Sequence, residues 1–238
     1  MNILIWNCNM AFRKKYHTVL SRKIDLAIIS ECEHKEKLEE ALAKKSYNDI
    51  IWHGNNPHKG IAIISFNQVR IKLLDIFNPE FEYVLPIQVS TKNRQLNLLA
   101  IWAMPNKTTP SKSYVGQIWG AINHYTKLLD QPTLLAGDLN SNTMWDTKRK
   151  IGTHTHVVSF LAKYNIHSIY HQLRNLAHGS ERQPTLYLLK KKTKPYHIDY
   201  CFASSALISS STTFKIGSYK KWISYSDHMP IWVENLQV

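Results

Sequence analysis

The sequence predicts one α/β domain over residues 1–238, and three observations lead to this fold class. Apolar strand-like runs alternate with amphipathic helical runs near both ends of the chain, whereas five short strand-like runs follow one another between them. Several apolar runs end in carboxylate and amide side chains, as the strands of α/β sheets do at their functional edge. With 44% hydrophobic residues among 238, the chain has enough apolar material for a large core.

The first part of the chain follows the order strand, helix, strand, helix. Residues 2–6 and residues 25–29 predict two buried strands, because each run is apolar after its polar first residue, Asn2 or Asp25. Residues 11–23 between them, and residues 34–45 after them, carry apolar side chains at helical spacing. This order predicts a parallel pair of strands whose carboxyl ends share one edge of a sheet.

The middle of the chain predicts antiparallel strands, because its short apolar runs are separated by turn residues. These runs are residues 49–53, 60–66, 69–77, 83–90 and 95–102. A helix at residues 113–129 then leads into a buried strand at residues 133–136. The last part repeats the alternation, with a helix at residues 153–164 that Thr153 can cap and with strands at residues 184–189, 197–203, 215–219 and 231–233.

The composition narrows the class of partner. A net charge of +13 with histidine neutral, and a pI near 9.6, favour a polyanion such as nucleic acid or an anionic membrane surface. The three cysteines form no C-x-x-C pair, which argues against a zinc ribbon or a redox motif. Their small, odd number and the lack of a basic leader or a spanning apolar run predict a cytoplasmic protein.

The polar residues that end the apolar runs form four groups. The central group is Gly137-Asp138-Leu139-Asn140, in which positions two apart along an extended chain point to the same side. A carboxylate there can orient and deprotonate a water, and an amide can donate to a developing oxyanion. The other groups are Trp6-Asn7-Cys8-Asn9, Ile29-Ser30-Glu31, and His197-Ile198-Asp199-Tyr200 together with Ser226-Asp227-His228.

This set of side chains is rich in oxygen and contains one well-placed histidine. Hard oxygen donors favour Mg²⁺ or Mn²⁺ over zinc or copper, and Mg²⁺ held by one or two carboxylates is typical of phosphoryl chemistry. Asp199 is placed to hold the His228 imidazole in one tautomer.

Taken in order, the motifs W-N-x-N, S-E, G-D-L-N-S-N, H-I-D-Y and S-D-H-x-P resemble those of the endonuclease/exonuclease/phosphatase superfamily, which includes deoxyribonuclease I. The resemblance extends from Asn2 to Val233. It implies a four-layered α/β sandwich, in which two packed mixed β-sheets are flanked by helices, and metal-dependent cleavage of phosphoesters.

The resemblance also implies roles for individual residues. By similarity the catalytic residues are Asp138, Asn140, Asp199 and His228, and the metal ligands are Asn7, Glu31 and Asp227. The chain departs from the family where many members carry a histidine or tyrosine before a Pro-Asn turn, because Trp102 and Ala103 stand there. Neither side chain can protonate a leaving group, although a metal-bound water could act as the acid in place of the histidine or tyrosine.

Further residues are expected to contact the substrate because they are basic or polar and follow the catalytic motifs. They are Asn9, Lys14, Lys15, Lys148, Arg149 and His197. Together with a lysine-rich hairpin at residues 190–194, the basic members predict a groove for a nucleic-acid backbone, with DNA preferred over RNA.

Three functions therefore remain open. The first is a nuclease that hydrolyses phosphodiester bonds by in-line attack of water. The second is a phosphatase or phosphodiesterase for a small or lipid-linked phosphate ester. The third is a catalytically weak member that binds nucleic acid.

Overall fold

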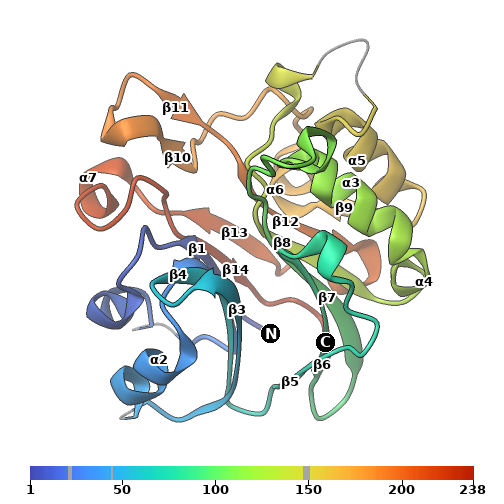
Figure 1. The fold of residues 1–238 in the computed structure, drawn as a ribbon. Helices are drawn as coiled ribbons and strands as arrows, with labels where there is room; N and C mark the ends of the chain where they lie inside the picture. The colour runs from blue at the N-terminus through green and yellow to red at the C-terminus, as the bar shows by residue number, and fades with distance from the viewer. Residues whose placement is uncertain (21–22, 44, 147–150) are drawn as a thin grey trace.

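A computed structural model of the protein describes residues 1–20, 23–43, 45–146 and 151–238, which form two six-stranded sheets (Figure 1). The first sheet has the spatial order β13 (Thr213–Ile216), β14 (Ile231–Glu234), β1 (Ile3–Asn7), β2 (Leu26–Cys32), β4 (Lys59–Phe66) and β3 (Tyr47–Asn56). The second has the order β5 (Arg70–Leu73), β6 (Val84–Ser90), β7 (Gln95–Trp102), β8 (Thr133–Asp138), β12 (Asp199–Ser204) and β9 (Ile166–Ser168).

Both sheets are mixed. The pairs β1–β2 and β7–β8 are parallel, and the other neighbours in each sheet are antiparallel. Strands β10 (Leu186–Tyr187) and β11 (Pro195–Tyr196) form a separate hairpin that projects from one end of the sandwich (Figure 1).

Alternation along the strands explains why the sheets pack face to face. In β1, Ile3 and Ile5 belong to the core between the sheets, whereas Leu4 and Trp6 face the opposite side. Successive side chains of a strand point to opposite faces, so an entirely apolar strand must be covered on both sides.

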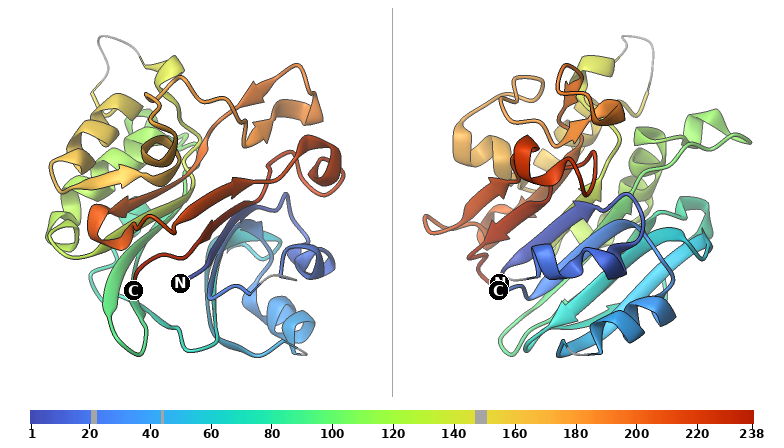
Figure 2. Two further views of the ribbon diagram at one scale, coloured as in Figure 1. Left: turned by 180° about the vertical axis from the view of Figure 1, so that it is seen from behind. Right: turned by 90° about the vertical axis from the view of Figure 1, so that its left-hand side faces the viewer.

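Helices provide the two outer layers (Figure 2). The first sheet is covered by η1 (Phe12–Lys14), α1 (Tyr16–Val19), α2 (Lys35–Leu42) and α7 (Tyr219–Trp222). The second is covered by α3 (Val115–His124), α4 (Thr126–Leu129) and α5 (His154–Ala162), with α6 (Ile169–Arg174) beside β9 and β12. Short helical turns occur at η2 (Pro79–Phe81), η3 (Pro110–Lys112), η4 (Thr143–Trp145), η5 (Leu188–Lys190) and η6 (Ser205–Leu207). The four-layered sandwich is therefore confirmed.

The helix predicted at residues 11–23 is wrong in its extent. Asn9, Met10 and Ala11 all have positive φ, so the chain is still turning where the helix was expected to begin. In the described part of this range η1 and the single turn α1 follow, and Lys15 between them has a non-helical φ of −120°.

Other differences concern short elements. The strand predicted at residues 69–77 is limited to β5, the helix predicted at residues 113–129 divides into α3 and α4, and β13 begins two residues before the predicted strand 215–219. Elements that were not predicted include β9, β11, α6 and α7. Within the described ranges, no helix combines the length and apolar character needed to cross a bilayer.

Candidate active site

The site forms where β1, β2 and β8 end, at the edge of the sandwich from which the β10–β11 hairpin projects (Figure 1). Asn7 is the last residue of β1 and Asp138 the last of β8, and Glu31 lies near the end of β2. Strand β1 contacts β8 across the two sheets, so both sheets contribute to one site. The expected convergence of the polar groups at strand ends is thus present.

Asp138 is the centre of the hydrogen-bond network. Its carboxylate is 1% exposed and accepts the side-chain amide of Asn7 at 2.9 Å. It also accepts the backbone amide of Asn140 at 2.9 Å and the side-chain amide of Asn140 at 3.2 Å. His228 Nε2 lies 3.9 Å from Asp138 Oδ2, which is longer than a hydrogen bond.

A glycine makes this arrangement possible. Gly137 has φ +141°, and a Cβ atom there would lie 1.8 Å from the carbonyl oxygen of Ile101 on β7. Only glycine lets β8 approach β7 so closely while turning Asp138 into the site.

His228 is held from behind by Asp199. Their Nδ1 and Oδ2 atoms are 2.9 Å apart, and both residues are buried. Asp199 pairs directly with Asp138 in the β8–β12 register, and its backbone amide donates to the Thr185 hydroxyl. An imidazole bound at Nδ1 by a carboxylate presents Nε2 to its other neighbours.

The buried charges alter one another's protonation. Burial would lower the pKa of His228, but the carboxylates of Asp199 and Asp138 outweigh it and raise the pKa to about 10. Burial, followed by repulsion from Asp199, raises the pKa of Asp138 to about 7. A carboxylate with a pKa near neutrality is suited to accept a proton from water.

Glu31 reaches the site through an irregularity of β2. The register between β2 and β4 shifts between Ser30 and Cys32, and Glu31 has a φ of +56°. A β-bulge redirects one side chain of its strand. The bulge therefore explains why the Glu31 carboxylate faces the site although β2 is otherwise mostly apolar. Glu31 Oε1 accepts the Asn7 amide at 3.3 Å and lies 3.2 Å from Lys59 Nζ.

Asp227 approaches from the last loop. Its Oδ1 accepts the Asn9 side-chain amide at 3.3 Å. Ser226 fixes this loop, because its hydroxyl donates to the Asn7 carbonyl at 2.8 Å and accepts the amide of His228 at 3.0 Å.

The resemblance implies Glu31, Asn7 and Asp227 as metal ligands, and carboxylate and amide oxygens suit Mg²⁺ or Mn²⁺. The Asn7 side-chain nitrogen faces Glu31, whereas its oxygen accepts the Asn9 backbone amide at 3.1 Å. The Lys59 ammonium beside Glu31 shows that this carboxylate already pairs with a cation. A further group of possible ligands, Asp138, Asp199 and His228, lies directly beside it.

The predicted substrate contacts occupy different environments. Lys14 is exposed, whereas the Lys15 ammonium donates to the carbonyls of Cys8, Asn9 and Tyr225 and so anchors the loop after β1. Lys148 and Arg149 lie outside the described residues.

His197 is 4% exposed, and its ring packs between those of Tyr170 and Tyr200. Its Nδ1 lies 2.8 Å from the Gln183 carbonyl. His197 therefore lies in the protein interior and not on an open face. Its contact with a substrate stays a prediction.

Two residues of the site were missed. Lys59 opens β4, and its position opposite Glu31 depends on the β2–β4 pairing. Thr185 precedes β10, and its hydroxyl accepts the amides of both Ile198 and Asp199 at 3.0 Å. Neither stands in a recognisable motif, so only the fold reveals them.

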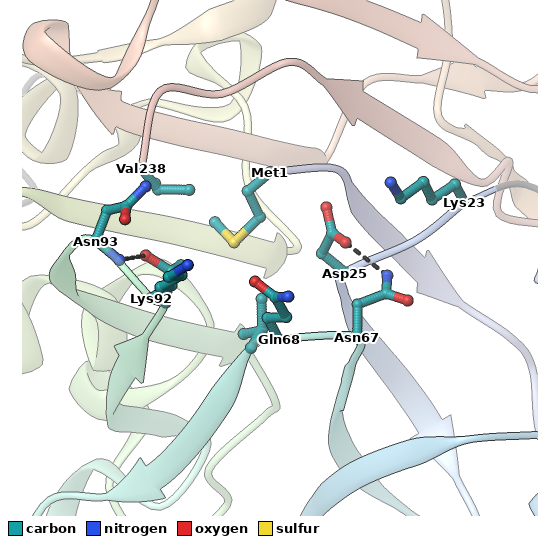
Figure 3. Close-up of a pocket in the computed structure, with 10 residues that line it drawn as sticks. Met1, Lys23, Asp25, Asn67, Gln68, Lys92, Asn93 and Val238 are labelled. Carbon is teal, nitrogen blue, oxygen red and sulfur yellow. Dashed lines mark hydrogen bonds between the residues drawn. The ribbon is translucent and has the colours of Figure 1, made fainter.

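Concavity alone does not locate the site. A cavity of about 600 Å³ lies near the two chain termini, where Met1, Asp25, Asn67 and Lys92 line it (Figure 3). Its lining contains none of the residues described above. The candidate site is defined by the convergence of charged groups.

Comparisons with known proteins agree with this architecture. No protein-family model and no curated protein matches the sequence. Solved structures do match. The endonuclease domain of TRAS1, a telomere-specific non-LTR retrotransposon, has a TM-score of 0.65 at 15% identity and covers 98% of this chain and 96% of its own. The 3'-5' exonuclease NExo from Neisseria meningitidis has a TM-score of 0.67 at 15% identity, with 100% of both chains covered.

An AP endonuclease from Archaeoglobus fulgidus is similar over 100% of both chains, with a TM-score of 0.68 and 13% identity. At these identities the likeness concerns the fold. The protein has the mixed two-sheet α/β sandwich of the endonuclease/exonuclease/phosphatase superfamily, the deoxyribonuclease I-like class.

Proposed function

We propose that the protein is a divalent-metal-dependent phosphoric ester hydrolase and that it is a nuclease. The observation that carries this proposal is the buried constellation of Asp138, Asp199 and His228, held by amides from Asn7 and Asn140. Its parts suit in-line attack of water on phosphorus, in which positioning and electrostatic stabilisation supply most of the catalysis.

In this mechanism Asp138 orients the attacking water and accepts its proton, because its pKa is raised to about 7. Protonated His228 donates from Nε2 to a non-bridging oxygen of the phosphate, and Asp199 keeps the imidazole oriented. The amides of Asn7 and Asn140 stabilise the Asp138 carboxylate and the charge that develops beside it.

Mg²⁺ or Mn²⁺ bound at Glu31, Asn7 and Asp227 would neutralise the phosphate oxygens and acidify a bound water. This chemistry could replace the acidic side chain that is lacking at Trp102 and Ala103. Trp102 packs against Tyr83, and the carbonyl of Ala103 accepts the Asn140 amide at 2.9 Å.

A nucleic-acid substrate is supported by the basic hairpin next to His228. Leu186 at the start of β10 forms a bridge with His228, and the amide of Tyr187 donates to the carbonyl of Asp227. The connection between β10 and β11 carries Lys190, Lys191, Lys192 and Lys194, all exposed. Lysines attached so directly to the catalytic loop suit a substrate with phosphates on both sides of the cleaved bond.

DNA is the nucleic acid that we propose. One similar structure is described as the 3' phosphatase NExo bound to a product DNA hairpin, with a TM-score of 0.70 at 16% identity, and another is the AP endonuclease named above. We also propose a cytoplasmic location, which suits three buried free cysteines.

The test is nicking of supercoiled plasmid in Mg²⁺ or Mn²⁺, compared with EDTA. Asp138→Asn and His228→Ala are each expected to lower kcat by ~10²–10³, because each removes a group that acts on the reacting centre. Asp75→Asn is the matched control, since Asp75 lies on an exposed turn and pairs with the exposed Lys72.

Metal-dependent nicking that both site variants lose and D75N keeps would support a nuclease. A wild type that does not nick DNA or cleave RNA would refute it. A panel of small and lipid-linked phosphate esters would then separate a phosphatase from a catalytically weak binding protein.

A further inference from the structure

A small pocket opens beside the catalytic residue Asn140. Its volume is about 270 Å³, just below the roughly 300–1,000 Å³ of pockets for drug-sized ligands, so it suits one ring system. The lining comes from the start of α3 and from the segment that follows β8, namely Tyr114, Val115, Asn140, Ser141, Asn142, Trp145, Asp146 and Thr153.

Two aromatic side chains of this lining are open to solvent. Tyr114 is 42% exposed and Trp145 is 48% exposed, whereas Val115, Ser141, Asn142 and Thr153 of the same lining are buried. Trp145 is supported by Tyr196 of the basic hairpin, with ring centroids 5.3 Å apart and planes tilted by 41°. The pocket is thus connected to the hairpin that carries the exposed lysines.

The backbone of Tyr114 is strained. This residue has φ 49° and ψ −122°, which a side chain with a Cβ atom rarely adopts, and its amide donates to the Met104 carbonyl at 2.9 Å. Strain of this kind is concentrated at functional sites, where it holds a side chain in a required position.

The polar side chains of the lining already have protein partners. The Asn142 amide donates to the His197 carbonyl and the Tyr200 hydroxyl, and the Asp146 carboxylate accepts the Thr155 amide at 2.8 Å. The accessible aromatic faces therefore dominate what the pocket offers to a ligand. Such faces bind planar rings by stacking and discriminate little among bases.

Asn140 connects the pocket to the reacting centre. Its side-chain amide is 3.2 Å from Asp138 Oδ2, and the same residue lines the pocket. A nucleotide whose phosphate lies at Asp138 and His228 would have its base within reach of this pocket.

We propose that the pocket of Tyr114 and Trp145 binds one unpaired nucleobase next to the cleaved phosphate, by stacking. The inference rests on the proposed nuclease function. It adds that the base next to the cleaved bond must be unpaired, so that in a duplex its base pair would have to open. A base of any identity is accepted, whereas a nucleotide without a base loses this contact.

The test uses single-stranded oligonucleotides in which a tetrahydrofuran analogue replaces one nucleotide on either side of a mapped cleavage site. For the wild type, one such position is expected to raise KM by about 5- to 100-fold relative to a natural base, the range for one stacked base. Tyr114→Ala and Trp145→Ala are expected to abolish this difference, and Tyr114→Phe to keep it. Leu173→Ala, an exposed position on α6 outside the pocket, is the control.

A second readout does not depend on cleavage. An oligonucleotide with 2-aminopurine at the sensitive position should lose fluorescence on binding to the metal-free wild type and to Y114F, but not to W145A. Equal KM values for base-containing and base-free substrates in an active wild type would overturn the pocket assignment alone. A wild type that neither binds nor cleaves nucleic acid would overturn the proposed function itself.

Discussion

At the scale of single residues, the site depends on charges that control one another. Asp199 lies 2.9 Å from His228 and pairs in register with Asp138, so its carboxylate affects the pKa of both. It favours the charged form of the imidazole and disfavours the charged form of Asp138. One substitution at position 199 should therefore move two titrations in the same direction.

We expect Asp199→Asn to lower the pKa of both His228 and Asp138 in the metal-free protein. The wild-type imidazole should stay protonated at pH 8, because its pKa is about 10. In D199N it should lose its proton at a lower pH. NMR of the histidine ring nitrogens in metal-free samples measures this directly, and an unchanged His228 titration would contradict the geometry.

At the scale of elements, the parallel pair β7–β8 sets the position of Asp138. The pair runs in register from Asn97 and Thr133 to Trp102 and Asp138, and Gly137 lies next to its end. The position of Asp138 therefore depends on how closely the backbones of β7 and β8 approach each other.

Gly137→Ala should destabilise the protein by about 3 kcal/mol or more, since a Cβ atom would lie 1.8 Å from the Ile101 carbonyl oxygen at a positive φ. The free energy of unfolding from urea titration provides the measurement. A variant within about 1 kcal/mol of the wild type would show that β8 can move away from β7 at low cost.

A second set of side chains with shifted pKa values lies in the segment from α5 to β12. It consists of His154, His178 and His197. Burial lowers the pKa of His154 and His197 to about 4 and that of His178 to about 3. His154 Nε2 and His178 Nδ1 are 3.2 Å apart, and the His171 and His178 rings stack with centroids 3.7 Å apart.

Acid should therefore weaken this segment. Below its ordinary pKa of about 6.5, a histidine binds a proton in the unfolded chain that the folded protein does not accept, so stability falls as the pH falls. Between pH 7 and pH 5.5, His178 alone should account for a loss of about 1 kcal/mol. His178→Asn should lose less stability than the wild type over this interval, in urea titrations at both pH values. His17→Asn at an exposed position is the control, and equal losses in wild type and H178N would refute the argument.

At the scale of the whole molecule, the net charge of +13 and its placement predict the response to salt. For duplex DNA, the logarithm of the binding constant falls with that of the salt concentration, with a slope of about −0.9 for each phosphate neutralised. A nuclease that uses the hairpin lysines should show a slope of about −4 or steeper.

Lys191→Gln and Lys192→Gln should each make the slope shallower by about 1 without changing sequence preference. Fluorescence anisotropy with a labelled duplex in Ca²⁺ at several salt concentrations tests this. A slope near zero in the wild type would favour a small phosphate ester as substrate.

The four-layered fold could be predicted because its motifs stand in a fixed order on apolar strands. The site residues lie together as the resemblance implied, because each motif follows a strand whose apolar pattern is clear in the sequence. These residues are Asn7, Glu31, Asp138, Asn140, Asp199 and His228. Their catalytic and metal-binding roles remain predictions.

What could not be predicted depends on contacts distant in sequence. The helix expected at residues 11–23 has the right periodicity, but the positive φ angles at residues 9–11 and the bonds of Lys15 to three carbonyls determine its path. Lys59 and Thr185 act on residues 28 and 14 positions away in the chain, and nothing local indicates those partners. The bulge at Glu31 is likewise visible only in the register.

The Ser226 hydroxyl bonds the carbonyl of Asn7, which lies 219 positions earlier, and β14 pairs with β1. The ribosome makes Asn7 long before His228, so a nascent chain cannot assemble the constellation until the loop before β14 has emerged. A chain that ended before Ser226 would lack the His228 imidazole, and it would also lack β14, which pairs with β1. If the protein is the nuclease proposed above, it would stay inactive on the messenger that encodes it until this late segment has been made and has folded against β1.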